Sequence, residues 1–215
     1  VHSLADGDRE FSFYRNPGAD IMLTDQEVSK KLMEECRIFH FGSLSLPDEP
    51  AETATKKAVD FAKSAGNLVS FDPNYRDALW GSEERAKQAV WYGIGACDIL
   101  KIADYEIKWL TGLDDYDKGV RMIQERSEAK LINVTLGCQG SLAYYQGKKI
   151  FGDPFLSEKT IDTTGAGDTF CAGVLGFVLE HGLDDLKETD LEEMLTFANA
   201  AASIVTTRKG ALRSM

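Results

Sequence analysis

Short apolar runs alternate along the chain with longer segments in which apolar residues recur at every third or fourth position. The runs end at polar or glycine-containing turns and predict strands, whereas the longer segments predict helices. Strands are predicted at 36–41, 68–71, 98–102 and 131–135, with a hairpin over 142–151 that Gly147 interrupts. Helices are predicted at about 52–64, 82–93, 105–110 and 116–126, after Gly165, and from a cap at 189–192 onward.

The N-terminal part carries two further signals. Glu10–Arg15 alternates polar and aromatic residues, which predicts a half-buried strand that ends at Asn16–Gly18. Thr24 and Glu27 have the spacing of a capping box, which predicts that a short helix begins there.

Strands that alternate with helices favour parallel pairing. The predicted fold class is therefore α/β, a three-layer α/β/α sandwich with a mostly parallel sheet. In such sheets, ligands bind beyond the carboxyl ends of the strands. Chemistry is expected in the turns that follow the strands, at 42–43, 72–76, 103–106 and 135–137, and in the turn at 165–168.

Composition and charge narrow the class of protein. With 215 residues, of which 43% are hydrophobic, the chain is predicted to form one globular domain, 1–215. The formal net charge of −11 argues against a nucleic-acid partner, and no apolar run is long enough to span a membrane. The four cysteines are far apart and lack CxxC spacing, which favours reduced thiols and a cytoplasmic location.

The most informative stretch is DTTGAGDTFCAGVL, at 162–175. Gly165, Ala166 and Gly167 allow a bound group to approach the backbone, and the apolar periodicity after them predicts that a helix begins here. The N-terminus of a helix presents free N–H groups and favours anions, so the turn is a predicted anion site. Asp168 would repel a bound phosphate unless it accepts a proton during catalysis. From spacing alone, that role and a simple first-turn acid have equal weight.

Two other glycine motifs do not fit this stretch. The sequence has no GxxxxGK[ST] P-loop, and Phe170 stands where a dinucleotide fingerprint has its third glycine. The stretch closely resembles the C-terminal signature of the ribokinase/phosphofructokinase-B family of sugar kinases. Other stretches are similar to the fructokinase branch of that family, and together they extend along nearly the whole chain: FYRNPGAD (13–20), FHFGSLSL (39–46), FDPNYRDALW (71–80), KIADYEIKWLTG (101–112), TLG (135–137) and FANAAAS (197–203).

The resemblance implies a ribokinase-like fold with the remnant of a β lid, and a kinase that uses ATP, Mg²⁺ and, as an option, K⁺. It implies that Asp168 is the catalytic base. The amides of Gly165, Ala166 and Gly167 would stabilise the charge on the transferred phosphoryl group.

The resemblance also implies a nucleotide site and a metal role. Thr135 and Gly137 should flank the nucleotide, and Asn199 should lie beside the adenine, unless it is only a satisfied polar group on an alanine-rich face. Lys101 is grouped with these residues without an assigned role. Glu106 matches the family's NxxE glutamate, which organises magnesium and water.

The same motif has a departure and an alternative. Ala103 replaces the asparagine of NxxE, so the metal shell must be completed differently. Glu106 could instead be an ordinary first-turn acid.

On the sugar side, the resemblance places Tyr14 and Arg15 in a lid strand over the sugar. Asn74 and Arg76 should face the sugar or the phosphoryl group. Asn74 could equally shape an Asx turn after Pro73, and Tyr14 could fill the apolar face of the lid.

The family begins with a segment that holds the first strand, part of the lid and a Gly-Gly-Asn sugar motif, and nothing here resembles it. Residues 1–20 correspond to the return strand of the lid. The chain would then lack roughly a third of the usual family length. We expect such a chain to be inactive by itself and to form a homodimer through the lid.

The implied function is transfer of the ATP γ-phosphoryl group to D-fructose, which yields fructose 6-phosphate. The partners are then a sugar and ATP. Alternative acceptors are 2-keto-3-deoxygluconate, aminoimidazole riboside and ribose. A non-catalytic fragment that binds a nucleotide or a sugar is a rival of a different class.

Overall fold

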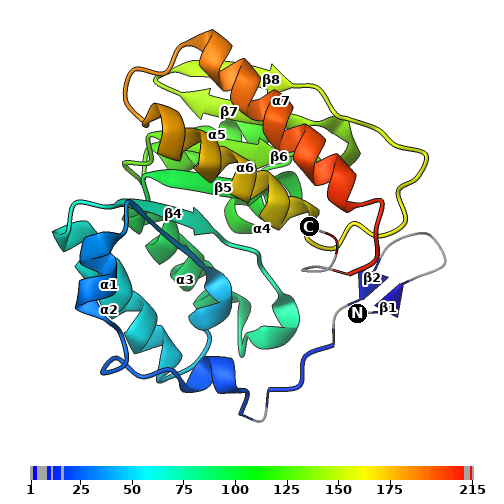
Figure 1. Cartoon of the computed structure of the whole chain (residues 1–215). Helices are drawn as coiled ribbons and strands as arrows, with labels where there is room; N and C mark the ends of the chain where they lie inside the picture. Colours follow the sequence, from blue (N-terminus) through cyan, green and yellow to red (C-terminus); the bar gives the residue numbers. More distant parts are fainter. Residues whose placement is uncertain (1, 4–8, 11, 16, 211–213, 215) are drawn as a thin grey trace. The chain divides into compact units, whose positions relative to one another are not determined.

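The computed structural model describes residues 2–3, 9–10, 12–15, 17–210 and 214 (Figure 1). Contacts within the chain divide it into two compact units. Unit 1 consists mainly of residues 10–129, and unit 2 mainly of residues 130–215. That residues 1–215 form one domain stays a prediction.

Unit 1 contains a parallel sheet with the strand order β3–β4–β5. The strands are β3 (Ile38–Gly42), β4 (Leu68–Asp72) and β5 (Ile99–Ala103). β5 is buried along its whole length, as is usual for parallel strands that are covered on both faces. The parallel pairing predicted for these strands is confirmed, and the register places Gly42 opposite Asp72.

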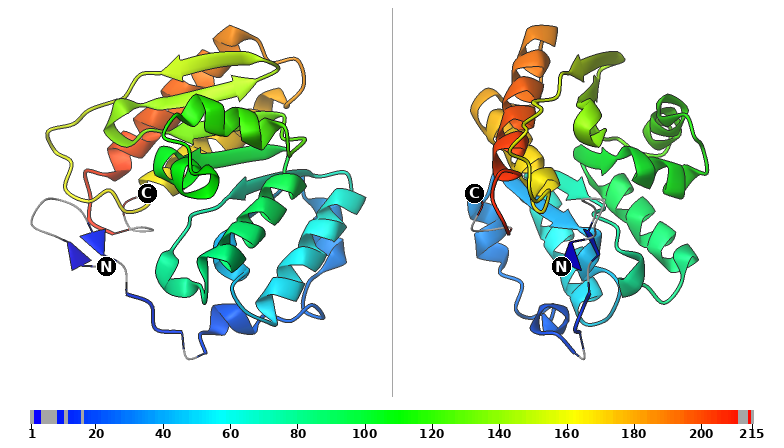
Figure 2. Two further views of the ribbon diagram at one scale, coloured as in Figure 1. Left: turned by 180° about the vertical axis from the view of Figure 1, so that it is seen from behind. Right: turned by 90° about the vertical axis from the view of Figure 1, so that its right-hand side faces the viewer.

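The helices of unit 1 follow local capping signals. Ser82 accepts the Arg85 N–H at the start of α3, and Gly112 ends α4 with a left-handed φ of 74°. Figure 2 shows α2 and α3 side by side. The bounds are α1 (Lys30–Glu35), α2 (Ala51–Ser64), α3 (Glu83–Ala96), α4 (Asp104–Thr111) and α5 (Tyr116–Gln124), with 3-10 turns at Ala19–Met22, Ser43–Ser45 and Asp77–Leu79.

The core of unit 1 fixes the position of β4. Phe71 is fully buried, and an added Cβ at Gly93 of α3 would come within 2.3 Å of its ring. Phe41 of β3 packs against Phe71, with ring centroids 4.7 Å apart. This packing on both sides of Phe71 holds Asp72, the last residue of β4, at a defined place.

Unit 2 contains an antiparallel sheet covered by two long helices. Its strands are β6 (Leu131–Thr135), β7 (Ser141–Tyr145) and β8 (Lys148–Gly152), which confirm the predicted hairpin. Figure 1 shows α6 (Ala166–His181) and α7 (Glu188–Val205) side by side in front of these strands. A Cβ at Gly173 of α6 would lie 3.1 Å from the Ala198 Cα of α7, so the two helices pack closely there.

Two predicted elements in the N-terminal part differ from the structure. The strand expected at Glu10–Arg15 is limited to β2 (Arg9–Glu10), which pairs with β1 (His2–Ser3); Phe11 and Asn16 lie outside the described residues. The Thr24 capping box forms, because the Thr24 N–H donates to Glu27 Oε2 at 2.8 Å. The residues after Thr24 form a turn and not a helix. The helix α1 begins later, at Lys30.

The last helix also begins at a different residue from the one predicted. Its N-cap is Lys187, whose N–H donates to Asp190 at 2.8 Å, and Thr189 lies inside the first turn. Among the helices that the structure describes, none is long and apolar enough to cross a membrane.

Candidate active site

Three charged side chains gather at the carboxyl ends of β4 and β5 in unit 1. Asp72 ends β4, Lys101 lies in β5 and Glu106 lies in the first turn of α4; they are 3%, 7% and 1% exposed. The Lys101 Nζ atom lies 3.0 Å from Asp72 Oδ2. Charged groups are seldom buried unless they are paired, so this cluster is an unusual feature of unit 1.

The carboxylate of Glu106 is bonded to backbone on both sides. Its Oε1 accepts the Tyr75 N–H and its Oε2 accepts the Ala103 N–H, each at 2.8 Å. Burial and then the charge of Asp72 raise the pKa of Glu106, whereas Lys101 acts to lower it. Glu106 therefore caps α4, as a first-turn acid can, and also holds the turn that contains Tyr75.

A metal ion at Glu106 would need further ligands from its surroundings. Within the part of the chain that the structure describes, no three His, Cys, Asp or Glu side chains are arranged to hold a metal ion. A magnesium ion beside Glu106 would take most of its ligands from phosphates and water, as Mg²⁺ commonly does in proteins. The metal role of Glu106 stays a prediction.

The turn at 72–76 is shaped by Asp72. Its Oδ1 accepts the Asn74 N–H at 3.1 Å, which makes an Asx turn. Asn74 itself takes a left-handed φ of 45°, a conformation that asparagine tolerates better than most residues. The Asx turn considered for Asn74 is thus present, but the acceptor belongs to Asp72. That Asn74 faces a sugar stays a prediction.

Two stacked aromatic rings, those of Tyr75 and Trp109, lie at the end of this turn. Tyr75 stacks on Trp109 of α4, with ring centroids 3.9 Å apart and an interplanar angle of 19°. The Tyr75 hydroxyl donates to Asp77 at 2.9 Å, and burial together with this bond raises the pKa of Tyr75 to about 12. Arg76 is half-buried and its Nη1 donates to the Tyr75 carbonyl at 2.8 Å. A contact of Arg76 with the phosphoryl group stays a prediction.

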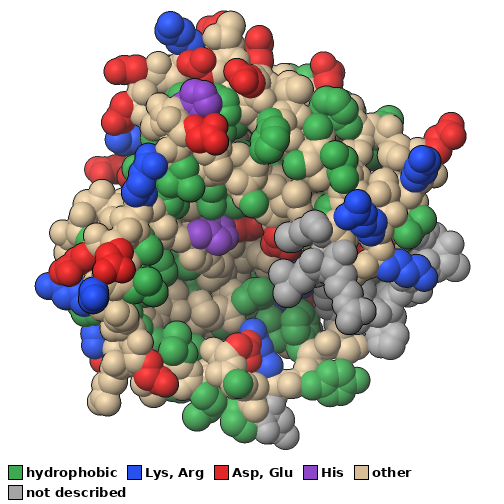
Figure 3. Space-filling model, in the orientation of Figure 1, with side chains coloured by type: hydrophobic (Ala, Val, Ile, Leu, Met, Phe, Trp, Pro, Cys, Tyr) green, Lys and Arg blue, Asp and Glu red, His purple; other side chains and the backbone are tan. Residues whose placement is uncertain are grey.

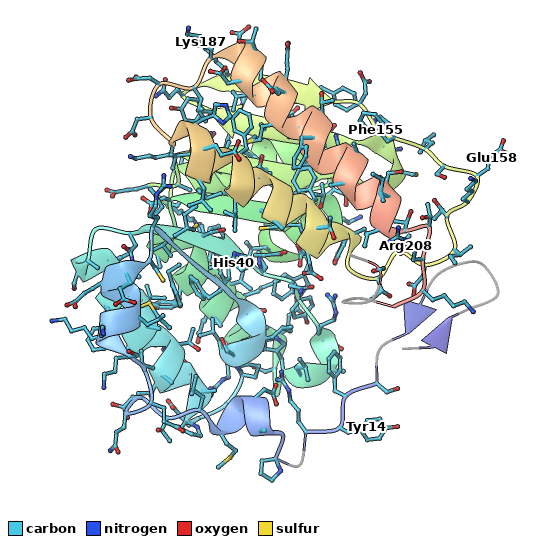
Figure 4. The ribbon with its side chains drawn as sticks, viewed as in Figure 1. Tyr14, His40, Phe155, Glu158, Lys187 and Arg208 are labelled. Carbon is cyan, nitrogen blue, oxygen red and sulfur yellow. The ribbon has the colours of Figure 1, made fainter. Side chains whose placement is uncertain are left out.

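The two residues predicted for the lid behave differently. Residues 12–15 have no regular secondary structure, and Tyr14 is 92% exposed, which contradicts a ring packed into an apolar lid face. Figure 4 shows Tyr14 extending away from the ribbon. Arg15, in contrast, is held within unit 1, because it donates to the Leu44 carbonyl at 3.1 Å and pairs with Asp20. That either residue covers a sugar stays a prediction.

In unit 2 the turn before α6 has the geometry of an anion site. Gly165 is the N-cap of α6 and has a left-handed φ of 82°, which glycine adopts without strain. Asp168 lies in the first turn, is exposed, and accepts no hydrogen bond from the residues that the structure describes. The Ala166 N–H donates to the Thr163 carbonyl at 3.2 Å, so its predicted contact with a phosphoryl group requires this bond to be shared.

Two hydroxyl groups beside this turn are buried without partners. Neither Thr164 Oγ1 nor Thr169 Oγ1 meets a hydrogen-bond partner among the described residues. Buried polar atoms are usually paired, so these hydroxyls fit a site that a polar ligand completes. Together with the left-handed glycine, they make the turn suitable for the phosphate groups of a nucleotide.

Asp162 fixes this turn from its N-terminal side. Its Oδ1 accepts the Thr164 N–H at 2.9 Å and its Oδ2 accepts the Gly210 N–H at 3.0 Å. The N–H of Asp162 donates to the Thr206 carbonyl at 3.1 Å. The glycine turn is therefore tied to the chain that follows α7.

The remaining nucleotide residues also lie in unit 2. Thr135 is half-buried at the end of β6, and Gly137 follows it, exposed and with φ 59°. Asn199 of α7 is 9% exposed, and its Nδ2 donates to Ser141 Oγ at 2.9 Å and to the Asp153 carbonyl at 3.1 Å. These bonds give Asn199 a packing role, and only its Oδ1 is left for an adenine contact. All three nucleotide roles stay predictions.

A groove of about 220 Å³ lies elsewhere in unit 1, between α2 and α3. Its charged groups are paired with one another, because Glu52 forms ion pairs with Lys56 and with Arg85 at 2.7 Å each. None of the predicted site residues lines it.

Comparison with known proteins identifies the family. The family model described as "pfkB family carbohydrate kinase" matches residues 1–215. The chain belongs to this family of carbohydrate kinases. Its predicted membership is confirmed.

Individual relatives agree with this assignment. The chain is 42% identical to Fructokinase-1 of Zea mays over 98% of its own length and 65% of that protein. A fructokinase structure from Xylella fastidiosa with bound ATP superposes with a TM-score of 0.88 at 28% identity, covering 98% of this chain and 67% of that one.

A second structure, a fructokinase from Vibrio cholerae with fructose, ADP and calcium ion, gives a TM-score of 0.81 at 27% identity. It covers 92% of this chain and 63% of that one. These agreements confirm the predicted ribokinase-like α/β fold. The chain spans about 65% of the length of the curated relative from Zea mays.

Asp72, Trp109 and Asp162 lie in stretches that the sequence analysis singled out, but sequence reasoning gave none of them a function. A usable signal existed for Asp72, because an Asp followed two residues later by Asn in a turn is the spacing of an Asx turn. No local pattern could have paired Asp72 with Lys101, which is 29 residues away. The contact depends on the parallel register of β4 and β5.

Proposed function

We propose that the full-length protein transfers the γ-phosphoryl group of ATP to a hydroxyl group of a sugar. D-Fructose is the preferred acceptor in this proposal, and fructose 6-phosphate the product. The observation that carries it is the turn before α6, where a left-handed Gly165, a helix N-terminus and an exposed Asp168 lie within a few residues. The relatives named fructokinase support the choice of acceptor.

In this reaction Asp168 accepts the proton of the attacking sugar hydroxyl. The hydroxyl oxygen forms a bond to the γ-phosphorus, and the bond from that phosphorus to the β–γ bridging oxygen breaks, which yields ADP. The N–H groups of Gly165, Ala166 and Gly167 stabilise the charge on the transferred group. Phosphoryl transfer depends mainly on such positioning and electrostatic stabilisation, and little on covalent chemistry from the protein.

Mg²⁺ is the proposed divalent ion, and Glu106 is the residue that would help to hold it, together with phosphate oxygens and water. Bound Mg²⁺ supplies charge neutralisation for the phosphates. This matters in a chain with a net charge of −11. K⁺ is the monovalent ion to test, because a Vibrio cholerae fructokinase double mutant was solved with potassium.

A cytoplasmic location belongs to the same proposal. Cys36, Cys97, Cys138 and Cys171 are all free thiols, which is typical of proteins in a reducing compartment. A homodimer formed through residues 1–20 is the proposed assembly.

The proposal is tested by assaying ATP-dependent phosphorylation with the full-length protein and a panel of acceptors. We expect the highest kcat/KM with D-fructose and lower values with ribose, aminoimidazole riboside and 2-keto-3-deoxygluconate. Higher kcat/KM with one of the other acceptors would correct the substrate. ATP binding without phosphorylation of any acceptor would contradict the enzymatic proposal.

A further inference from the structure

Apart from the proposed part of Glu106 in holding Mg²⁺, the charged cluster of unit 1 has no role in the reaction steps given above. Asp72, Lys101 and Glu106 come from three elements, β4, β5 and α4, and each is at least nine-tenths buried. Two carboxylates and one ammonium group give the cluster a net charge of −1 when all are ionised. A packed apolar cluster would cost less to bury, so the charges call for an explanation.

The cluster holds one short stretch of backbone. Asp72 Oδ1 accepts the Asn74 N–H at 3.1 Å, and Glu106 Oε1 accepts the Tyr75 N–H at 2.8 Å. These two successive amides belong to the turn in which Asn74 has the left-handed φ of 45°. A non-glycine residue in that region persists only where its surroundings hold it.

Lys101 pairs with Asp72, the acceptor of the Asn74 N–H, and has little access to a ligand. Its Nζ lies 3.0 and 3.3 Å from the two oxygens of Asp72, and the residue is only 7% exposed. A lysine that binds phosphate directly must present its ammonium group to the ligand. The burial of Lys101 therefore argues against a direct contact with the nucleotide, although Lys101 was grouped with the nucleotide residues.

We propose that Asp72, Lys101 and Glu106 are positioning residues, which hold the Asn74–Arg76 turn in the conformation needed for phosphoryl transfer. This inference rests on the proposed function for its effect on catalysis, but the holding of the turn is independent of it. Lys101 neutralises Asp72, Asp72 and Glu106 bind the turn amides, and the turn then presents Asn74 and Arg76. A displacement of about 1 Å in such a segment can lower turnover roughly 10²-fold.

The test is a double-mutant cycle in the full-length protein with Lys101→Met, Asp72→Asn and the double variant. Lys101→Met leaves two buried carboxylates without their cation, so we expect kcat for fructose to fall about 10²-fold, with little change in KM for ATP. In the double variant the asparagine that replaces Asp72 still offers an Oδ1 acceptor, and no charge is left unpaired at that position. We expect this variant to recover at least about tenfold of the lost kcat, because coupled residues are not additive.

A second readout does not need enzymatic activity. Trp109 stacks on Tyr75 of the turn, so its fluorescence and near-UV circular dichroism report displacement of the turn. We expect Lys101→Met and Glu106→Gln to change the Trp109 signal, which is identified by subtracting the spectrum of Trp109→Phe. Lys108→Met is the control, because Lys108 lies on the same helix as Trp109 and forms an exposed ion pair with Asp114, beyond the end of that helix.

The outcomes separate this inference from the proposed function. A raised KM for ATP in Lys101→Met, with kcat unchanged and no recovery in the double variant, would make Lys101 a nucleotide ligand and overturn the inference. An unchanged Trp109 signal in both single variants would also overturn it. If the wild-type protein phosphorylates no sugar but the Trp109 signal changes, the proposed function fails and the holding of the turn stands. Should Lys101→Met not fold, the double variant and Glu106→Gln carry the test.

Discussion

Asn133 is a polar side chain in the core of unit 2. It lies at the centre of β6 opposite Ala143, is fully buried, and neither its Nδ2 nor its Oδ1 meets a partner among the described residues. Removing a buried polar group that has no partner is often neutral or stabilising when the replacement has a similar shape. We therefore expect Asn133 to lower the stability of unit 2.

We predict that Asn133→Leu raises the free energy of unfolding by about 1–2 kcal/mol, because it removes the desolvation cost of the amide. Urea unfolding of the variant and the wild type measures the difference. Asn133→Asp is the control and should destabilise strongly, since it buries a charge in the same place. A less stable Asn133→Leu would mean that a buried water molecule satisfies the amide.

Glu106 gives a prediction for pH. Burial raises its pKa in the folded protein above the ordinary value of 4.5, so the folded state keeps a proton that the unfolded chain releases. The contribution of Glu106 to stability is then fully present below pH 4.5 and is lost as the pH rises towards the folded pKa. We predict that the stability of wild type minus that of Glu106→Gln decreases as the pH is raised above 4.5. A difference that is constant or increases with pH would show that the two N–H bonds and Lys101 outweigh burial.

Helix α3 offers a matched pair of glycines at the scale of the element. A Cβ at Gly93 would come within 2.3 Å of the Phe71 ring, whereas a Cβ at the exposed Gly95 meets nothing within 4 Å. Both residues lie inside the same helix, so both substitutions gain the helix propensity of alanine. Only the substitution at Gly93 must displace the ring of Phe71, the core residue of β4.

We predict that Gly93→Ala lowers the free energy of unfolding by about 1–3 kcal/mol through overpacking. Gly95→Ala should raise it by about 0.5–1 kcal/mol, because glycine inside a helix loses more conformational freedom on folding. Thermal and urea unfolding of the wild type and the two variants measure these changes in the free energy of unfolding. Equal effects from the two substitutions would contradict the tight packing of α3 on β4.

Elements with strong periodicity could be predicted from the sequence, and elements that depend on distant contacts could not. β6 was predicted at its observed bounds, because its apolar run is closed by a polar turn on both sides. The capping box at Thr24 formed without a helix after it, since local hydrogen bonds alone do not supply an apolar face to bury. Residues 12–15 alternate like a strand, but no partner strand pairs with them among the described residues.

The candidate site was predictable only in part, for the same reason. The Gly165–Asp168 turn is contiguous in the sequence, so its helix start and left-handed glycine follow from local rules. The cluster of Asp72, Lys101 and Glu106 depends on the register of parallel strands, and the burial of Lys101 could not be read from its neighbours in sequence. The packing role of Asn199 needed its contact with Ser141, 58 residues away.

At the scale of the whole molecule, the balance of charge matters most. A net charge of −11 opposes the binding of ATP, so the proposed reaction depends on locally placed N–H groups and cations. On the face drawn in Figure 3, Lys and Arg side chains are scattered among Asp and Glu side chains. Phosphate binding would then come from the helix N-terminus of α6 and a metal ion, rather than from a broad basic surface.

The most direct test of the account is fructose-dependent ADP formation by the full-length protein and its Asp168→Asn variant, with ATP binding measured on the same samples. The variant keeps the shape of the side chain and removes the proton acceptor. We predict that its turnover falls ~10²–10⁴-fold while its Kd for ATP stays near the wild-type value. Glu180→Gln, at an exposed acid on the same helix, should leave both quantities unchanged. Turnover close to wild type in Asp168→Asn would contradict the assignment of Asp168 as the base.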